Sequence, residues 1–180
     1  VGAMCTTSGQ AASLLSILNL CSAGESFIAS STIYGGTINL FAVTLKKFGI
    51  ECIFVNSDAS NEEIQKAFKQ NTKAVFGETL ANPALTIFDI EKFANIAHKN
   101  NVPLIVDNTF ATPILCRPFE FGADIIVLTE TSSILNLGEN YNCISTETLT
   151  ENYDNINYKV GENRTSIWTK YNFVNHFQTF

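Results

Sequence analysis

Short apolar runs alternate with amphipathic stretches along the first two thirds of the chain. Each run is four to six residues long and rich in Val, Ile, Phe or Ala, which predicts a buried strand. The predicted strands are residues 26–31, 51–55, 73–77, 103–106 and 124–127. The amphipathic stretches predict helices at residues 10–20, 36–48, 61–68 and 89–100.

Residues typical of helix ends support these boundaries. Ser8 precedes the first helix as an N-cap, and Gly49 follows the second helix, where a left-handed backbone is common. Ser60 and Glu63 have the spacing of a capping box, and Asp89 precedes the fourth helix. Because the strands are apolar on both faces and alternate with helices, we predict an α/β fold: a mostly parallel sheet with helices on both faces.

Composition narrows the function classes. The chain has 180 residues, of which 46% are hydrophobic and 16% charged, and it has no apolar run of membrane-spanning length, so we expect a globular protein outside the membrane. Its first residues lack the pattern of a secretory signal, and the expected location is cytoplasmic. The formal net charge is −6 and the lysines are dispersed, which argues against a nucleic-acid partner.

Five scattered cysteines contain no C-x-x-C pair, which argues against a disulfide framework and against a metal site. We expect buried free thiols at all five positions. They are Cys5, Cys21, Cys52, Cys116 and Cys143.

The composition changes near residue 128. Residues 1–127 contain all four prolines and every alanine, whereas residues 128–180 contain neither but have nine asparagines and eight aromatic residues. We therefore predict one α/β domain at residues 1–127 and an unrelated tail at residues 128–180. Alternating positions at 165–173, after a turn-like segment at 160–163, predict a hairpin in that tail, and poor order is the alternative.

Polar residues at helix starts and after strands carry the candidate chemistry, because ligands of parallel sheets bind at the carboxyl ends of the strands. Ser8, Gly9 and Gln10 open the first helix, where unpaired N–H groups and the helix dipole favour a phosphate. The alternative is a plain N-cap. Tyr34, followed by two glycines, offers a ring face for stacking, and its alternative is a packed tyrosine in a turn.

Two more candidates follow the third and fourth predicted strands. Asn82, before Pro83, can donate a hydrogen bond to a phenolic oxygen, although such a pair alone is also typical of a turn. Asp107 ends a buried apolar strand, and a carboxylate there needs a partner. A protonated ring nitrogen is the partner that we favour, and the alternative is an Asp that caps the following loop.

These segments together resemble the Cys/Met-metabolism enzymes that depend on pyridoxal phosphate (PLP). The resemblance runs through residues 8–10, 34–37, 78–83 and 106–109 and continues along residues 112–124. At residues 115–120 the run Leu-Cys-Arg-Pro-Phe-Glu is more similar to O-acetylhomoserine sulfhydrylases than to cystathionine synthases or lyases. The resemblance implies the PLP-binding large domain of a fold-type I enzyme, present incompletely.

The resemblance also implies roles for the candidates. Gly9 and Gln10 would hold the phosphate, Tyr34 would stack on the ring, Asn82 would contact the ring oxygen and Asp107 would pair with the ring nitrogen. Ser8 and Thr109, beside them in the same motifs, belong to the predicted cofactor-binding set. The implied partners are a small amino-acid substrate and further copies of the chain, since the family is homo-oligomeric.

One motif of the family is altered. Where the family has the lysine that binds PLP covalently, this chain has Ser132, so no catalytic residue is assigned and any PLP is expected to bind non-covalently. Thr129 and Thr131 remain as hydroxyl groups that can contact the phosphate. The resemblance further implies a tyrosine and an arginine from an N-terminal segment of a neighbouring subunit, and a carboxylate-binding arginine from a C-terminal domain. We expect no counterpart of either in this sequence.

Three functional hypotheses follow. The first is a PLP-dependent transferase that makes homocysteine or methionine from O-acetylhomoserine and sulfide or methanethiol. The second is a truncated or frame-disrupted copy without catalytic activity. The third is a non-enzymatic partner of an intact homologue.

Overall fold

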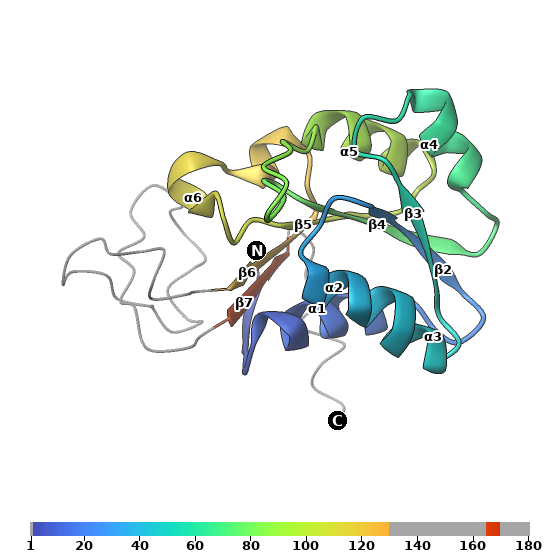
Figure 1. Ribbon diagram of the computed structural model, residues 1–180, viewed down its shortest axis with the longest axis horizontal. Helices are drawn as coiled ribbons and strands as arrows, with labels where there is room; N and C mark the ends of the chain where they lie inside the picture. Colours follow the sequence, from blue (N-terminus) through green and yellow to red (C-terminus); the bar gives the residue numbers. More distant parts are fainter. Residues whose placement is uncertain (1, 130–164, 170–180) are drawn as a thin grey trace.

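The computed structural model describes residues 2–129 and 165–169, and it places them around one central sheet (Figure 1). The sheet has the strand order β1-β7-β6-β5-β4-β2-β3. Its strands are β1 (Gly2–Thr6), β2 (Ser26–Ser30), β3 (Glu51–Val55), β4 (Thr72–Glu78), β5 (Leu104–Asp107), β6 (Ile125–Thr129) and β7 (Thr165–Thr169). Strands β2 to β6 pair in parallel, whereas β7 is antiparallel to both of its neighbours.

Helices cover both faces of the sheet, which confirms the predicted fold class (Figure 1). On one face lie α1 (Gly9–Leu18) and a continuous helical segment composed of α2 (Gly35–Asn39), a π-helical turn η1 (Leu40–Thr44) and α3 (Leu45–Lys47). On the other face lie α4 (Asn61–Ala67), α5 (Ile90–Lys99), α6 (Thr112–Leu115) and the 3-10 turn η2 (Pro118–Phe121). The parallel strands run between these two helical layers, and both of their faces are therefore covered.

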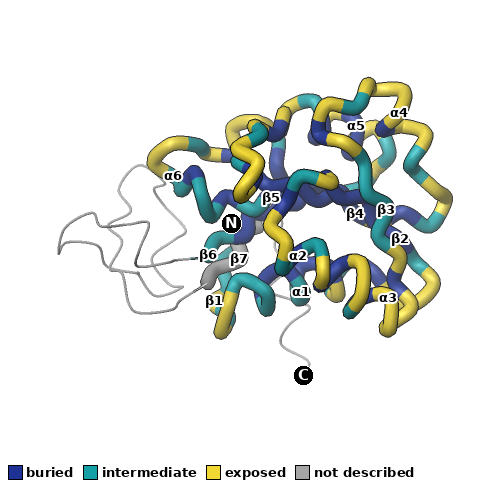
Figure 2. Tube along the Cα trace, viewed as in Figure 1, coloured by how far each residue is buried: buried dark blue, intermediate teal, exposed yellow. Residues whose placement is uncertain are grey.

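Successive residues of each strand supply two separate cores. In β4, Phe76 packs into the core beneath α1 to α3, whereas Val75 packs into the core beneath α4 and α5. Phe41 of η1 joins the first core through edge-on ring contacts with Phe27 and Phe76, each with 4.9 Å between ring centroids. The buried trace in Figure 2 runs through the middle strands and is flanked by exposed helix surfaces.

Local signals placed the helix ends correctly. The Ser8 hydroxyl accepts a hydrogen bond from Ala11 N, and Ser60 and Glu63 form the reciprocal capping box. Asp89 caps α5 through Lys92 N, and Gly49 has a φ of 76° after the helical segment. These residues act on backbone groups within one turn, which is why short sequence patterns reveal them.

The edge of the sheet at β1 was not predicted. The apolar run in Gly2–Thr6 is weak, and β1 gains its place from pairing with the distant strand β7. Thr6 pairs with Thr165, 159 positions later in the chain, and Gly2 pairs with Thr169, 167 positions later. For β7, both sides are occupied, by β6 and β1, so Thr165–Thr169 pairs with strands of the predicted body rather than with a second strand of the tail. Leu128 and Thr129 of the predicted tail belong to β6, and its residues 130–164 and 170–180 lie outside the described residues.

The prediction that all cysteines are buried is correct for one of the four described cysteines. Cys21 is a buried free thiol as predicted, whereas the free thiols of Cys52 and Cys116 are only partly buried. Cys5 is exposed because it lies on an outer strand, and Cys143 is outside the described residues. Within residues 2–129 and 165–169, no group of three or more His, Cys, Asp or Glu residues could hold a metal ion. The helices of the same residues include none with the length and apolar character needed to cross a bilayer.

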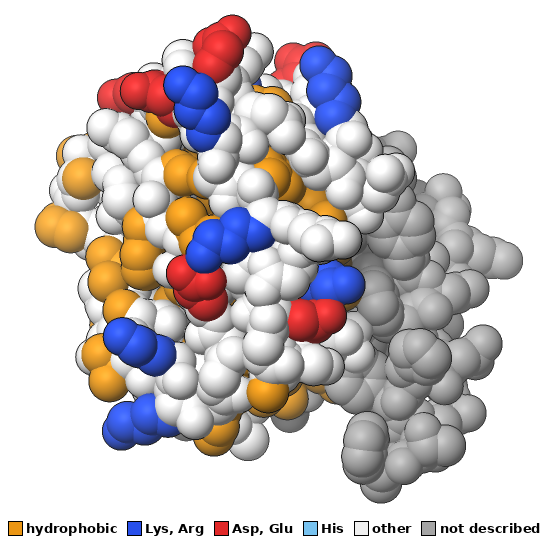
Figure 3. Space-filling view, turned by 90° about the vertical axis from the view of Figure 1, so that its right-hand side faces the viewer, with side chains coloured by type: hydrophobic (Ala, Val, Ile, Leu, Met, Phe, Trp, Pro, Cys, Tyr) orange, Lys and Arg blue, Asp and Glu red, His pale blue; other side chains and the backbone are white. Residues whose placement is uncertain are grey.

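Charged side chains of both signs lie near each other on the face shown in Figure 3, with hydrophobic side chains between them. Two ion pairs join neighbouring elements: Lys69 with Glu51 at 2.7 Å and Lys73 with Glu25 at 3.2 Å. Their side chains are partly or largely exposed, so each pair contributes little to stability.

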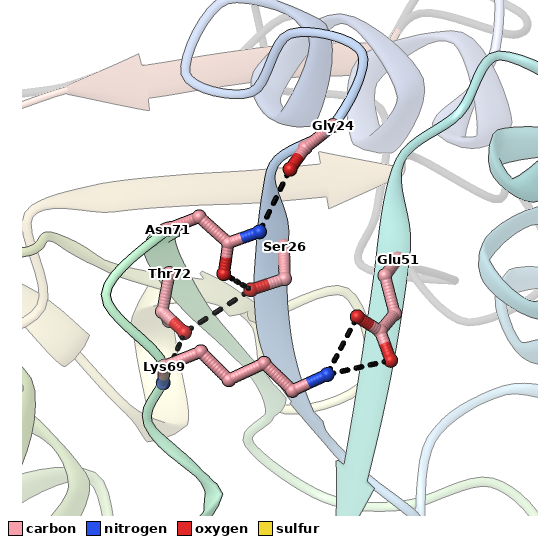
Figure 4. A network of polar contacts seen from close by, with 6 residues as sticks. All are labelled: Gly24, Ser26, Glu51, Lys69, Asn71 and Thr72. Carbon is pink, nitrogen blue, oxygen red and sulfur yellow. Dashed lines mark hydrogen bonds and ion pairs between the residues drawn. The ribbon is translucent and has the colours of Figure 1, made fainter.

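A polar network ties together the amino-terminal ends of β2, β3 and β4 (Figure 4). Asn71 Nδ2 donates to Gly24 O at 2.7 Å, and Asn71 Oδ1 accepts from Ser26 Oγ at 3.2 Å. Ser26 Oγ also lies 3.1 Å from Thr72 Oγ1, and Lys69 extends the network to Glu51. Ser26 is fully buried, so its hydroxyl depends on these partners.

We expect Asn71→Ala to lower the free energy of unfolding by about 1–3 kcal/mol, because it removes two hydrogen bonds and leaves the buried Ser26 hydroxyl with one partner fewer. Lys69→Ala is the matched control in the same network. Because the ion pair of Lys69 is exposed, we expect Lys69→Ala to lower the free energy of unfolding by less than about 1 kcal/mol. Urea denaturation of both variants measures the difference, and an equal or larger loss for Lys69→Ala would show that the ion pair, not Asn71, holds these strands.

Candidate active site

Three polar side chains form a row at the carboxyl ends of adjacent parallel strands. Glu78 ends β4, Asp107 ends β5 and Thr129 ends β6. Each lies two positions after a residue of the core beneath α1 to α3: Phe76, Ile105 and Val127. Since side chains alternate between the faces of a strand, all three polar residues belong to the face that α1 and α2 cover.

The start of α1 packs against the β6 end of this row. A side chain at Gly9 would overlap the Thr129 hydroxyl, so the absence of a Cβ allows the helix to approach the strand. Ser8 is the N-cap, and its hydroxyl is engaged by Ala11 N at 3.1 Å. The first N–H groups of a helix have no partner within the helix, and at Gly9 they lie beside Thr129.

The start of α2 packs against the β4 end of the row. Tyr34 is the N-cap residue, and its N–H donates to Glu78 Oε2 at 2.6 Å. Gln10 Nε2 donates to Thr37 Oγ1 at 3.3 Å, which links the first turns of α1 and α2. The Tyr34 ring lies over Gly36, and the residue is 51% exposed, so part of it remains open to a ligand.

Hydrogen bonds join Asp107 to the neighbouring strand. Asp107 Oδ1 accepts from Thr109 N at 3.0 Å and from Thr109 Oγ1 at 2.5 Å. The same Thr109 hydroxyl accepts from Thr129 N at 2.9 Å. Burial raises the pKa of the Asp107 carboxyl, whereas the two Thr109 donors act in the opposite direction.

Glu78 is a site residue to which the sequence reading gave no role. It is 5% exposed and is the register partner of Asp107 on the adjacent strand. Burial, together with the charge of Asp107, raises its pKa to about 8, although the Tyr34 N–H favours the ionised form. In the sequence, Asp107 was recognised as an acidic residue at the end of an apolar strand. Glu78 has the same kind of position, at the end of β4, and could have been recognised in the same way.

Hydrogen bonds do not join every residue of the predicted set. Asn82 is exposed in the loop between β4 and α5, and within the described residues its side chain makes no hydrogen bond to the other candidates. Thr79 Oγ1 donates to the buried Asn108 Oδ1 at 2.8 Å, which anchors the start of that loop to β5. Thr131 and Ser132 lie outside the described residues.

The arrangement offers three kinds of recognition side by side. The start of α1 favours an anion. The Tyr34 ring provides a surface for a flat molecule, and the Asp107 carboxylate favours a positively charged group. A ligand that combines a phosphate, an aromatic ring and a protonated ring nitrogen matches all three.

Comparison with known proteins agrees with this chemistry. A sequence model of the family described as Cys/Met metabolism PLP-dependent enzyme matches residues 1–136. An O-acetyl-L-homoserine sulfhydrylase of Corynebacterium glutamicum is 49% identical over 131 residues, which are 73% of this chain and 30% of the relative. A homocysteine/cysteine synthase of Saccharomyces cerevisiae is 44% identical over 133 residues, again 73% of this chain and 30% of the relative.

Solved structures extend the similarity to the fold. An O-acetylhomoserine sulfhydrylase of Wolinella succinogenes has a TM-score of 0.73 and 29% identity, and the match covers 94% of this chain and 42% of that one. A protein described as an O-acetylhomoserine (thiol)-lyase of Campylobacter jejuni, which carries N'-pyridoxyl-lysine-5'-monophosphate, has a TM-score of 0.68 and 44% identity over 70% of this chain and 31% of its own.

The chain thus spans less than half the length of the proteins to which it is similar. The match nevertheless includes the parallel strands and both helix starts that form the site. The chain belongs to the Cys/Met metabolism family of PLP-dependent enzymes.

Proposed function

We propose that residues 2–129 form the PLP-binding region of a transferase that replaces the acetoxy group of O-acetylhomoserine by sulfide or methanethiol. The names of the relatives support the substrate class, since relatives at 49% and 43% identity are described as O-acetyl-L-homoserine sulfhydrylases. The observation that carries the proposal is the row formed by Glu78, Asp107 and Thr129 beneath the starts of α1 and α2.

Specific residues fit the cofactor. Gly9, Gln10 and Thr129 would hold its phosphate at the start of α1, and Tyr34 would stack on its ring. Asp107 would pair with the ring nitrogen, and Thr109 holds that carboxylate in place. When bound, PLP supplies an electron sink for the carbon next to the substrate's amino group.

A charge argument supports the fit. Within the described residues, no Lys, Arg or His forms an ion pair with Asp107. A buried carboxylate with uncharged donors alone is costly, and a cationic ring nitrogen would offset that cost. Three further residues of the predicted set are proposed to contact the cofactor. They are Ser8 at the start of α1, Asn82 in the exposed loop after β4, and Thr131.

Ser132 favours a second reading of the function, in which the chain binds PLP without catalysis. Ser132 stands where the family has its lysine, and a serine neither bonds covalently to the aldehyde of PLP nor moves a proton as an amine does. We therefore propose that this chain, with serine at position 132, binds PLP reversibly and does not turn over O-acetylhomoserine. Self-association, as proposed from the family, is a separate question for sedimentation analysis of the same protein.

Equilibrium dialysis with PLP, pyridoxal and inorganic phosphate tests the binding proposal. PLP is expected to bind more tightly than either fragment, because only PLP uses both the α1 start and Asp107. An assay of sulfide consumption with O-acetylhomoserine, run in parallel, is expected to show no turnover. Equal affinity for PLP and phosphate would contradict the site, because it would leave the ring without a role.

A further inference from the structure

Glu78 is a buried carboxyl group that the proposed binding mode does not use. It lies one strand away from Asp107, in register with it and on the same face of the sheet. Adjacent strands are about 4.8 Å apart, so two ionised carboxylates in this arrangement would repel each other strongly. An acidic residue at this buried position therefore requires an explanation in terms of its contacts.

The contact of Glu78 with Tyr34 supplies one. The carboxyl oxygen Oε2 receives the Tyr34 N–H at 2.6 Å, directly at the residue where α2 begins. Tyr34 is followed by two glycines, which leave the backbone at this turn few restraints of its own. The hydrogen bond from the end of β4 thus links the sheet directly to the backbone of the residue whose ring is proposed to stack on the cofactor.

We propose that Glu78 is a positioning residue of this site, which holds Tyr34 in place and lets the Glu78 and Asp107 pair carry a single negative charge at neutral pH. The proposal rests on the proposed function, since it assumes that Tyr34 and Asp107 contact the cofactor. It assigns Glu78 no contact with the substrate.

The charges around Glu78 agree with this assignment. Asp107 faces it from β5, and the neutral Tyr34 N–H faces it from the start of α2. On the other side of β4, β2 ends in Ser30, which brings no ionisable group. Because the pKa of Glu78 is raised to about 8, Glu78 is mostly protonated at pH 7 and then places no negative charge beside Asp107.

Carboxyl-carbon NMR of the full chain without ligand tests the charge coupling. The Glu78 signal is expected to titrate with a midpoint near 8, and the Tyr34 amide is expected to follow the same midpoint. In Asp107→Asn the Glu78 midpoint should fall, because the neighbouring negative charge is gone. An unchanged midpoint in that variant, or a Tyr34 amide that ignores the titration, would overturn the proposal.

PLP affinity tests the positioning. Glu78→Ala is expected to weaken PLP binding at pH 7 about tenfold, the size typical of one lost hydrogen bond. Glu78→Gln keeps an acceptor for Tyr34 N–H and should remain within about threefold of the wild type. Glu62→Gln, the same substitution at an exposed residue of α4, is the control for a general effect of charge.

The outcomes separate the two proposals. If the wild type binds PLP and Glu78→Ala binds it equally well, the Glu78 proposal is wrong while the proposed function stands. If the wild type does not bind PLP, the proposed function is wrong, and the titration without ligand still decides whether Glu78 is coupled to Tyr34 and Asp107. If Glu78→Ala does not fold, the NMR signal of the Tyr34 amide in Glu78→Gln tests the positioning role instead. A large shift of that signal from its wild-type position would count against this role.

Discussion

Asp107→Asn is expected to raise the dissociation constant for PLP by at least about 100-fold. Asparagine keeps an oxygen for the two Thr109 donors, so the loop is expected to stay in place. What the variant loses is the negative charge beside the ring nitrogen, and breaking a buried charge pair costs about 3–5 kcal/mol. Spectrophotometric titration with PLP at constant pH measures the change.

A PLP analogue with carbon in place of the ring nitrogen sharpens this test. It should bind equally to the wild type and to Asp107→Asn, since it has no charge for Asp107 to pair with. Asp58→Asn, at an exposed position before α4, controls for the change in net charge and should leave the affinity for PLP unaltered. If Asp107→Asn lost affinity for the analogue as well, its effect would be structural and not electrostatic.

The Ser132→Lys variant is expected to convert reversible binding into covalent capture. Lysine supplies the amine that the family uses at this position, whereas the wild-type serine cannot react in this way. After incubation with PLP and borohydride, mass spectrometry should find the adduct on the peptide that contains residue 132 in the variant and no such adduct in the wild type. The change is all-or-none, which makes it the largest effect that we expect.

Ser133→Lys is the matched control for this variant. It introduces the same amine one residue later, and it should be modified far less because covalent capture depends on position. The wild type is also expected to show no turnover, since placed groups that transfer protons contribute about 10²–10⁴-fold to rates. A reducible adduct on Lys159 or Lys170 of the wild type, accompanied by turnover, would mean that another lysine replaces the missing one.

The site was predictable where it depends on the direction of parallel strands. Asp107 and the start of α1 were recognised because a charged residue after an apolar strand, and small residues before a helix, both point to the carboxyl edge of such a sheet. In the structure, hydrogen bonds join Asp107 through Thr109 to Thr129. Separate hydrogen bonds link Tyr34 to Glu78 and Gln10 to Thr37. The assignment of these residues to PLP and the division of the chain at residue 128 remain predictions.

The role of Glu78 depended on contacts that no short segment contains. Its partners are Tyr34, 44 positions earlier in the chain, and Asp107 on the next strand. The sequence places an acidic residue at the end of β4, but only strand pairing shows that it is in register with a second acid. For Asn82 the motif was recognisable, and the structure shows that the residue is exposed in the loop between β4 and α5, so its contact with the ring oxygen remains a prediction.

The sequence by itself determined the helices, the parallel strands and the caps, because periodicity and capping act over a few neighbouring residues. It also determined the family, through motifs that extend over most of the chain. Only the tertiary structure decided that β7 lies between β6 and β1, and that Glu78, Asp107 and Thr129 form one row. The physical reason is that register and strand order result from pairing between distant segments, whose local patterns are compatible with several neighbours.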